Sequence, residues 1–112
     1  LGAEALFIGA VEQDSSGYPD CRAEFFRAFE KALNYGTKPE TNIKIVTPII
    51  LLSKKEIVQQ AILLNVPLYL TWSCYVNEDA ACGECESCLL RLRGFEQAGY
   101  IDPIRYVNKA NE

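Results

Sequence analysis

The feature that most constrains this sequence is a cluster of cysteines, since four of the five in the chain lie between residues 74 and 88. They have the spacing C-x7-C-x2-C-x2-C, at Cys74, Cys82, Cys85 and Cys88. Two-residue spacings let successive sulfurs converge on one ion, and Gly83 gives the backbone room to turn between them. Because the chain has no histidine, any metal here is held by sulfur or carboxylate. The pattern predicts one Zn²⁺ ion in the segment 74–88, and four sulfur ligands with no open position are typical of a structural site.

Three other uses of these cysteines compete with zinc. Disulfides are typical of secreted chains, and nothing in this sequence marks it as secreted. Bacterial ferredoxins also carry C-x2-C-x2-C, followed by C-x3-C-P, but here the fourth cysteine lies upstream and no such motif follows. A redox-active pair leaves two neighbouring cysteines unexplained. Cys21 is far from the cluster, and we interpret it as a small buried residue outside the metal site.

Charge and composition argue against several classes of protein. The formal net charge is −4, and four thiolates bound to one Zn²⁺ would make the chain more negative still. This negative charge argues against sequence-independent binding of nucleic acid. No apolar run is long enough to span a membrane, and the first residues lack the basic region of a signal peptide, so we expect a cytoplasmic protein. The absence of histidine excludes Ser-His and Cys-His catalytic arrangements. The chain has no methionine and begins with Leu1, which suggests a fragment of a longer protein.

Short apolar runs alternate with segments of helical periodicity, which is the order expected of an α/β fold. In the first half of the chain we expect a strand over 5–10, a loop over 13–20, and a helix that begins at Cys21, is capped by Asp20 and ends at Gly36. A strand over 43–46 and a helix over 54–64 follow. The rest of the chain is expected to form a short strand over 68–70, a helix ending near Gly99 and an irregular tail over 101–112. Ser53 and Glu56 have the spacing of a capping box. Two strands joined by a helix are compatible with a parallel sheet. Because two or three strands make a thin sheet, residues 1–112 form either a single domain or the carboxyl-terminal half of one.

Several motifs together resemble those of one enzyme family. The first is Phe7-Ile8-Gly9, followed by a run from Asp14 to Phe25 that contains Ser-Gly-Tyr-Pro-Asp-Cys-Arg. The second is Thr47-Pro48 with Ser-Lys-x-Glu-Ile from Ser53. The third is Leu-Thr-Trp-Ser-Cys-Tyr from Leu70, with the remaining clustered cysteines downstream. This set resembles the 7-cyano-7-deazaguanine synthase family, the nitrile-forming ligases of queuosine precursor biosynthesis, from about residue 5 to residue 106.

The resemblance implies an ATP-dependent ligase that converts 7-carboxy-7-deazaguanine and ammonia, through an amide, into 7-cyano-7-deazaguanine. It implies a partial Rossmann-like parallel sheet of the ATP-pyrophosphatase type (adenine nucleotide alpha hydrolase-like), with a four-cysteine zinc-binding segment close to the active cleft. ATP, ammonia and the carboxylated base are the expected partners, without direct nucleic-acid binding, and a homodimer is compatible with the sequence. The four clustered cysteines correspond to the family's zinc ligands. The residues expected to line the substrate and phosphate cleft are Asp14, Ser16, Tyr18, Asp20, Arg22 and Lys54.

The sequence departs from the family pattern at its phosphate loop. Members of the family carry a Ser-Gly-Gly-x-Asp-Ser loop whose backbone amides cradle the ATP phosphates, and this chain has no such run. It therefore resembles the second half of the enzyme, and we expect the isolated chain to be inactive. Two other hypotheses stay open: a non-catalytic zinc-knuckle module that binds protein or RNA, and a related ATP-pyrophosphatase that acts on tRNA.

Overall fold

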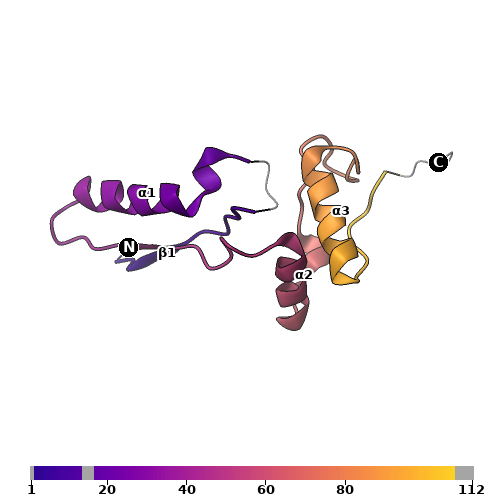
Figure 1. Cartoon of the computed structure of the whole chain (residues 1–112), viewed down its shortest axis with the longest axis horizontal. Helices are drawn as coiled ribbons and strands as arrows, with labels where there is room; N and C mark the ends of the chain where they lie inside the picture. The colour runs from indigo at the N-terminus through magenta and orange to yellow at the C-terminus, as the bar shows by residue number, and fades with distance from the viewer. Residues whose placement is uncertain (1, 14–16, 108–112) are drawn as a thin grey trace. The chain divides into compact units, whose positions relative to one another are not determined.

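The structure is a computed structural model that describes residues 2–13 and 17–107. The chain divides into two compact units, Leu1–Leu52 and Ser53–Glu112, each with its own secondary structure (Figure 1). Strands and helices alternate in the first unit, so the α/β class predicted from the sequence is confirmed. None of the helices in the described part of the chain is long and apolar enough to cross a membrane.

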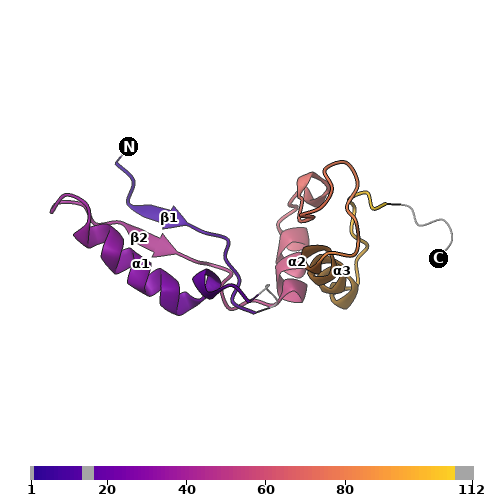
Figure 2. The ribbon, with the colours of Figure 1, turned by 90° about the horizontal axis from the view of Figure 1, so that it is seen from above.

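The first unit is a strand–helix–strand arrangement with a parallel sheet. β1 (Ala5–Phe7) and β2 (Lys44–Val46) run in parallel, with Leu6 opposite Ile45. α1 (Ala23–Tyr35) connects them and packs against β2, beside the two arrows in Figure 2. The prediction of two parallel strands joined by a helix is therefore confirmed.

β1 is shorter than the predicted strand over 5–10. Its backbone pairing continues to Ile8, whose N–H donates to the carbonyl oxygen of Val46 at 2.9 Å. The partner strand ends at Val46, shortly before Pro48, which has no backbone N–H to donate to a sheet. The length of β2 therefore limits the length of β1.

α1 begins later than predicted, and Asp20 does not cap it. Asp20 lies within the 3-10 turn η1 (Pro19–Cys21). The N-cap is Arg22, whose side chain makes no capping hydrogen bond. The N–H of Ala23 donates instead to Glu12 Oε2 at 3.3 Å. A carboxylate from another loop satisfies this helix terminus, which is why local capping preference predicted the wrong residue.

Side chains of α1 close the outer edge of β2. The N–H of Ile45 donates to Glu30 Oε1 at 2.7 Å. Asn34 makes two hydrogen bonds of 2.9 Å to the backbone of Ile43, one to its N–H and one to its carbonyl oxygen. Lys44 and Val46, which alternate with these residues along the strand, face the opposite edge and pair with the β1 segment. An edge whose backbone groups are already bonded to side chains is protected against pairing with another strand, so any further strand of this sheet is expected beside β1.

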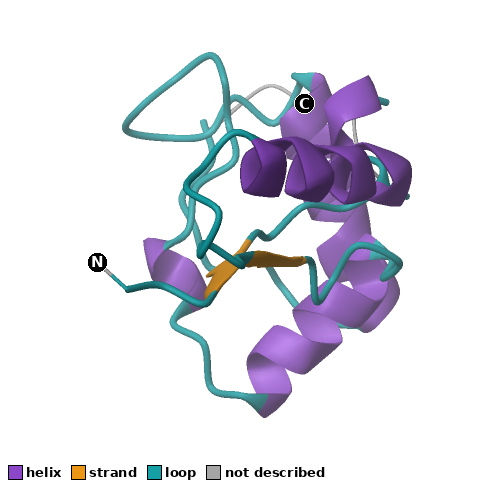
Figure 3. Ribbon diagram, turned by 90° about the vertical axis from the view of Figure 1, so that its left-hand side faces the viewer, coloured by secondary structure: helices purple, strands orange, loops and turns teal. Residues whose placement is uncertain are grey.

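The first unit buries little apolar surface. Phe25 and Phe29 stack on α1 with ring centroids 5.8 Å apart, yet they are 39% and 43% exposed, and Phe7 of β1 is 73% exposed. Among the described residues of this unit, the buried core consists of Val11 and Ile50. Apolar periodicity predicted the helix correctly, but a sheet of two short strands (Figure 3) is too narrow to cover its apolar face.

The second unit packs α2 (Lys54–Leu63) against α3 (Glu86–Ala98). The predicted capping box of α2 is present. The Ser53 hydroxyl accepts from the Glu56 N–H at 3.2 Å, and Glu56 Oε1 accepts from the Ser53 N–H at 3.1 Å. Gly99 follows α3 in the left-handed conformation, with a φ of 81°, and ends the helix where predicted. Local sequence therefore sets the start of α2 and the end of α3.

The predicted strand over 68–70 is wrong. Leu68–Leu70 form the 3-10 turn η2. The N–H of Leu70 donates to the carbonyl oxygen of Pro67 at 2.9 Å, and the N–H of Thr71 donates to Leu68 at 3.1 Å. These groups are bonded within the turn and so do not need a neighbouring strand.

The predicted irregular tail is partly ordered by pairing. Ala81 and Tyr106 form an isolated parallel bridge. The N–H of Ala81 donates to the carbonyl oxygen of Arg105 at 2.8 Å, and the N–H of Val107 donates to that of Ala81 at 2.9 Å. The chain after α3 therefore returns to the cysteine segment, while 108–112 lie outside the described residues.

Gly94 allows a close approach of α3 to the first turn of α2. A Cβ atom on Gly94 would lie 2.7 Å from the Lys54 Cβ and 3.4 Å from the Lys54 carbonyl carbon. Cβ atoms in proteins do not approach one another this closely. A residue without a Cβ is therefore required for this helix contact.

We expect Gly94→Ala to lower the free energy of unfolding by ~1–3 kcal/mol, because the added methyl group overpacks the contact between α2 and α3. Urea unfolding followed by circular dichroism measures the change. Lys54→Gly removes the opposing Cβ and should recover part of the loss, once its own cost of about 1 kcal/mol is subtracted. A Gly94→Ala chain as stable as the parent would show that the helices separate without cost.

Candidate metal centre

The structure brings together the four cysteines that the sequence predicts as metal ligands. Their sulfur atoms all lie within 4.8 Å of one another, and the Sγ atoms of Cys82 and Cys88 are 3.9 Å apart. Four sulfurs bound tetrahedrally at about 2.3 Å from one ion are separated by about 3.8 Å. The donor set therefore fits a single metal ion. All five cysteines are free thiols, and Cys21 lies outside the cluster, partly rather than fully buried.

Three neighbouring segments position the four sulfurs. Cys74 lies in a loop, Cys82 and Cys85 lie in a tight turn around Gly83, and Cys88 lies in the first turn of α3. Gly83 has a φ of 74°, which favours glycine at this turn. Cys85 is the N-cap of α3, and its sulfur accepts from the Cys88 N–H at 3.4 Å. These two cysteines therefore lie at the start of the last helix.

Backbone N–H groups donate to the sulfurs. Cys74 Sγ accepts from the N–H groups of Val76, Asn77 and Cys82 at 3.4, 3.3 and 3.4 Å. Cys82 Sγ accepts from the N–H of Cys85 at 3.2 Å. These donors stabilise a thiolate relative to a thiol, and the thiolate is the form that binds metals.

The cysteines differ in how readily they ionise. Hydrogen bonds from the backbone N–H groups of Asn77 and Cys82 lower the pKa of Cys74 to about 6. Burial raises the pKa of Cys88 to about 12, and this residue is only 1% exposed. Four thiolates in so small a space repel one another. A divalent cation is the partner that allows all four to ionise together.

A buried ion pair packs beside the cysteine cluster. The Nε and Nη2 atoms of Arg91 donate to the two carboxylate oxygens of Asp102 at 2.6 and 2.9 Å. Asp102 also accepts from the Tyr106 hydroxyl at 2.6 Å and the Ile104 N–H at 3.2 Å. Burial by itself raises the pKa of Asp102, but these hydrogen bonds outweigh it and hold the pKa below its ordinary value. The site therefore contains a carboxylate that stays ionised and fully bonded.

This network was not predicted from the sequence. Asp102 and Tyr106 fall in the tail that was expected to be irregular, and nothing in the dipeptide Asp102-Pro103 indicates a partner. The one available signal is helical spacing, since Arg91 lies three residues after Cys88 and so shares its face of α3. That signal places the guanidinium near the cluster but does not identify its carboxylate.

The structure describes four of the six predicted cleft residues, and their roles stay predictions. Tyr18, Asp20 and Arg22 are exposed and lie together in the segment that leads into α1. This segment follows the carboxyl end of β1, the edge at which open α/β sheets bind ligands. Lys54 is the first residue of α2, in the second unit. The predicted residues Asp14 and Ser16 lie outside the described residues.

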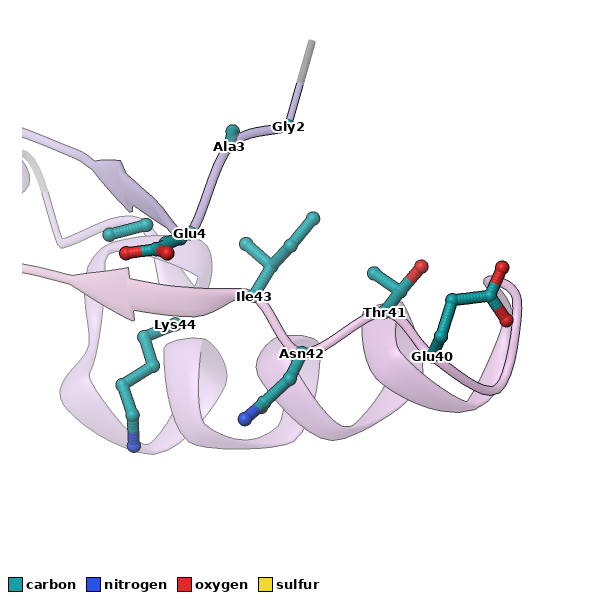
Figure 4. Close-up of a pocket in the computed structure, with 9 residues that line it drawn as sticks. Gly2, Ala3, Glu4, Glu40, Thr41, Asn42, Ile43 and Lys44 are labelled. Carbon is teal, nitrogen blue, oxygen red and sulfur yellow. The ribbon is translucent and has the colours of Figure 1, made fainter.

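One hollow of the first unit lies away from that edge. It has a volume of about 950 Å³ and is lined by residues 2–5 and 40–44, before and at the amino ends of β1 and β2 (Figure 4). Ligands of parallel sheets bind at the opposite, carboxyl edge, so this hollow is a poor candidate for a nucleotide site. In the second unit, a pocket of about 190 Å³ is lined by Lys54, Thr71, Ser73 and Arg91 together with apolar side chains.

Comparison with known proteins identifies the family. The family model described as "Queuosine biosynthesis protein QueC" matches residues 1–99. The chain belongs to this family. The QueC match includes the four clustered cysteines and every predicted cleft residue, but it ends before Asp102 and Tyr106.

Curated relatives of this QueC-family chain carry the name 7-cyano-7-deazaguanine synthase. The one from Sulfurovum sp. (strain NBC37-1) is 66% identical over 105 residues, which are 94% of this chain and 47% of the relative. The one from Nautilia profundicola is 62% identical over 108 residues, which are 96% of this chain and 49% of the relative. The one from Chlorobium chlorochromatii is 61% identical over 106 residues, which are 95% of this chain and 46% of the relative. The chain thus spans about half the length of the curated relatives it matches.

Proposed function

We propose that this chain is the metal-binding half of a 7-cyano-7-deazaguanine synthase and that Cys74, Cys82, Cys85 and Cys88 bind one zinc ion. The QueC family match over residues 1–99 carries the proposal, because the named relatives give the product of the reaction. The mutual approach of the four sulfurs supports zinc over an iron–sulfur cluster. A cluster places several metal ions between its thiolates and so holds them farther apart than a single ion does.

The proposed reaction is an ATP-dependent ligation. ATP activates the carboxylate of 7-carboxy-7-deazaguanine, ammonia displaces the activated oxygen to form an amide, and dehydration of the amide gives the nitrile. A zinc ion with four cysteine ligands has no open position, so it contributes structure rather than a reacting group. The cationic side chains of Arg22 and Lys54 suit contacts to phosphate, and Tyr18 offers an exposed aromatic ring to the base.

We also propose that the two strands belong to a larger parallel sheet of the ATP-pyrophosphatase type. The relatives are about twice as long as this chain. Glu30 and Asn34 occupy the outer edge of β2, whereas Phe7 on β1 is mostly exposed. The side chains on the edge of β2 favour extension of the sheet beside β1, and the exposed Phe7 shows that a face of β1 is uncovered.

The partners follow from the same proposal. They are ATP, ammonia and the carboxylated base, in a cytoplasmic enzyme, and a homodimer is compatible with it. A net charge of −4 opposes direct binding of nucleic acid. The synthase name of the relatives favours this function over the zinc-knuckle module and over an ATP-pyrophosphatase that acts on tRNA.

A chimera tests the function. These residues replace the corresponding half of the Nautilia profundicola relative, and mass spectrometry follows nitrile formation from 7-carboxy-7-deazaguanine, ammonia and ATP. We expect nitrile from the chimera and none from the 112-residue chain alone, because the phosphate loop expected of the family is not among its residues.

Two variants of the chimera sharpen the result. Lys54→Met should lower product formation by ~100-fold or more if the ammonium group stabilises phosphate charge, and the neighbouring Lys55→Met should leave it unchanged. A folded chimera that makes no nitrile, while the parent enzyme does, would contradict the proposed function.

A further inference from the structure

We infer that Arg91, Asp102 and Tyr106 are positioning residues for the metal site, which hold the cysteine-bearing segments in place through contacts that involve no metal. The inference concerns the geometry of the site rather than the ligation reaction. It rests on the proposed metal site but not on the proposed substrates.

The first segment held by this network carries Cys74. Arg91 Nη1 donates to the Ser73 hydroxyl at 3.4 Å, and Nη2 donates to the carbonyl oxygen of Leu68 at 3.5 Å. Ser73 directly precedes Cys74, so the guanidinium reaches the backbone neighbour of one ligand. Arg91 itself lies one helical turn after Cys88 on α3, which links a second ligand to the same side chain.

The next segment carries Cys82. Its neighbour Ala81 is fully buried and pairs with the backbone on both sides of Tyr106. The Tyr106 ring lies 3.6 Å from the position that a Cβ on Gly83 would occupy, so it packs against the turn that bears the ligands. The Tyr106 hydroxyl donates to Asp102, which closes the connection to Arg91.

All of these contacts meet at one carboxylate. Asp102 accepts hydrogen bonds from Arg91, Tyr106 and the Ile104 N–H, and its side chain is 3% exposed. Ile104 and Tyr106 also pack on the buried cluster that contains Cys74 and Cys88. A buried ion pair is poor at adding net stability, and in some proteins its contribution is to select one arrangement of the chain. Here the selected arrangement is the one in which four sulfurs converge.

Cobalt binding tests the inference in the whole chain. Co²⁺ bound to four thiolates gives charge-transfer and d–d absorption bands, which report the affinity and the geometry without any enzyme reaction. Tyr106→Phe keeps the ring and removes one hydrogen bond, and Asp102→Asn keeps the shape and removes the charge. We expect Co²⁺ affinity to fall by ~10-fold in Tyr106→Phe and up to ~100-fold in Asp102→Asn, as for other residues that orient metal ligands.

Two control variants separate positioning from general loss of stability. Tyr100→Phe changes the same residue type outside the network and should leave Co²⁺ affinity and the d–d bands unchanged. Gly94→Ala destabilises the packing of α2 and α3 without touching the network, and should change Co²⁺ affinity less than Tyr106→Phe does. Circular dichroism before the titration confirms that each variant is folded.

The outcomes are distinct. Wild-type affinity and spectrum in folded Tyr106→Phe would overturn the inference, and this variant decides alone if Asp102→Asn does not fold. An equal loss of affinity in Gly94→Ala would also overturn it. A wild-type chain that binds no Co²⁺ would refute the metal site itself, whereas a bound wild type with unaffected network variants would refute only the positioning role.

Discussion

Cys88→Ser is expected to reduce bound zinc from one ion per chain to almost none after dialysis against a weak chelator. Structural zinc sites bind with ~10–16 kcal/mol, so each of four thiolates contributes roughly 3 kcal/mol, or at least ~100-fold in affinity. Serine is nearly isosteric with cysteine, so the substitution at Cys88, which is 1% exposed, removes one thiolate ligand without opening a cavity. Metal content measured by mass spectrometry of the eluted protein gives the result directly.

Cys21→Ser is the matched control for this experiment. Cys21 is a free cysteine outside the cluster, so its replacement should leave one zinc ion per chain. The same substitution at Cys74, whose pKa is lowered to about 6, should behave like the one at Cys88. One ion per chain in Cys88→Ser, at the affinity of the parent, would mean that the clustered sulfurs are not the binding site.

The cysteine cluster could be predicted because its information is local. Two-residue spacings and a glycine in the turn bring Cys82, Cys85 and Cys88 together within one short segment, and the structure shows their sulfurs converging with that of Cys74. The capping box at Ser53 and the stop at Gly99 were predictable for the same reason. In each case the residues that decide the geometry lie within a few positions of one another.

The rest depended on partners that sequence spacing does not reveal. Asp102 bonds to Arg91 across a stretch of chain that reverses direction after α3, and Glu12 replaces Asp20 at the start of α1. The residues at 68–70 have strand-like composition, but they turn because Pro67 offers its carbonyl oxygen to a nearby N–H. A tertiary contact overrides local propensity at the start of α1, whereas at 68–70 a local turn does so.

Arg91→Met is expected to lower the free energy of unfolding by ~3–5 kcal/mol, the usual cost of removing one partner from a buried ion pair. The Asp102 side chain, 3% exposed, would keep a charge without its main partner, and the Tyr106 hydroxyl alone cannot replace the guanidinium. Urea unfolding of the zinc-loaded chain measures the loss. Arg93→Met, two residues along the same helix and exposed, is the control and should lower stability by no more than ~1 kcal/mol, since contacts of exposed charged side chains contribute little.

The double variant Arg91→Met, Asp102→Leu distinguishes the cost of an orphaned charge from the value of the pair. Replacing both partners with apolar side chains is often close to neutral, so much of the stability lost in Arg91→Met should return. Recovery will be incomplete, because the Tyr106 hydroxyl then lacks its acceptor. Zinc affinity should not recover with stability, since the contacts to Ser73 and Leu68 remain absent. A double variant that regains both would show that any well-packed core holds the four cysteines in place.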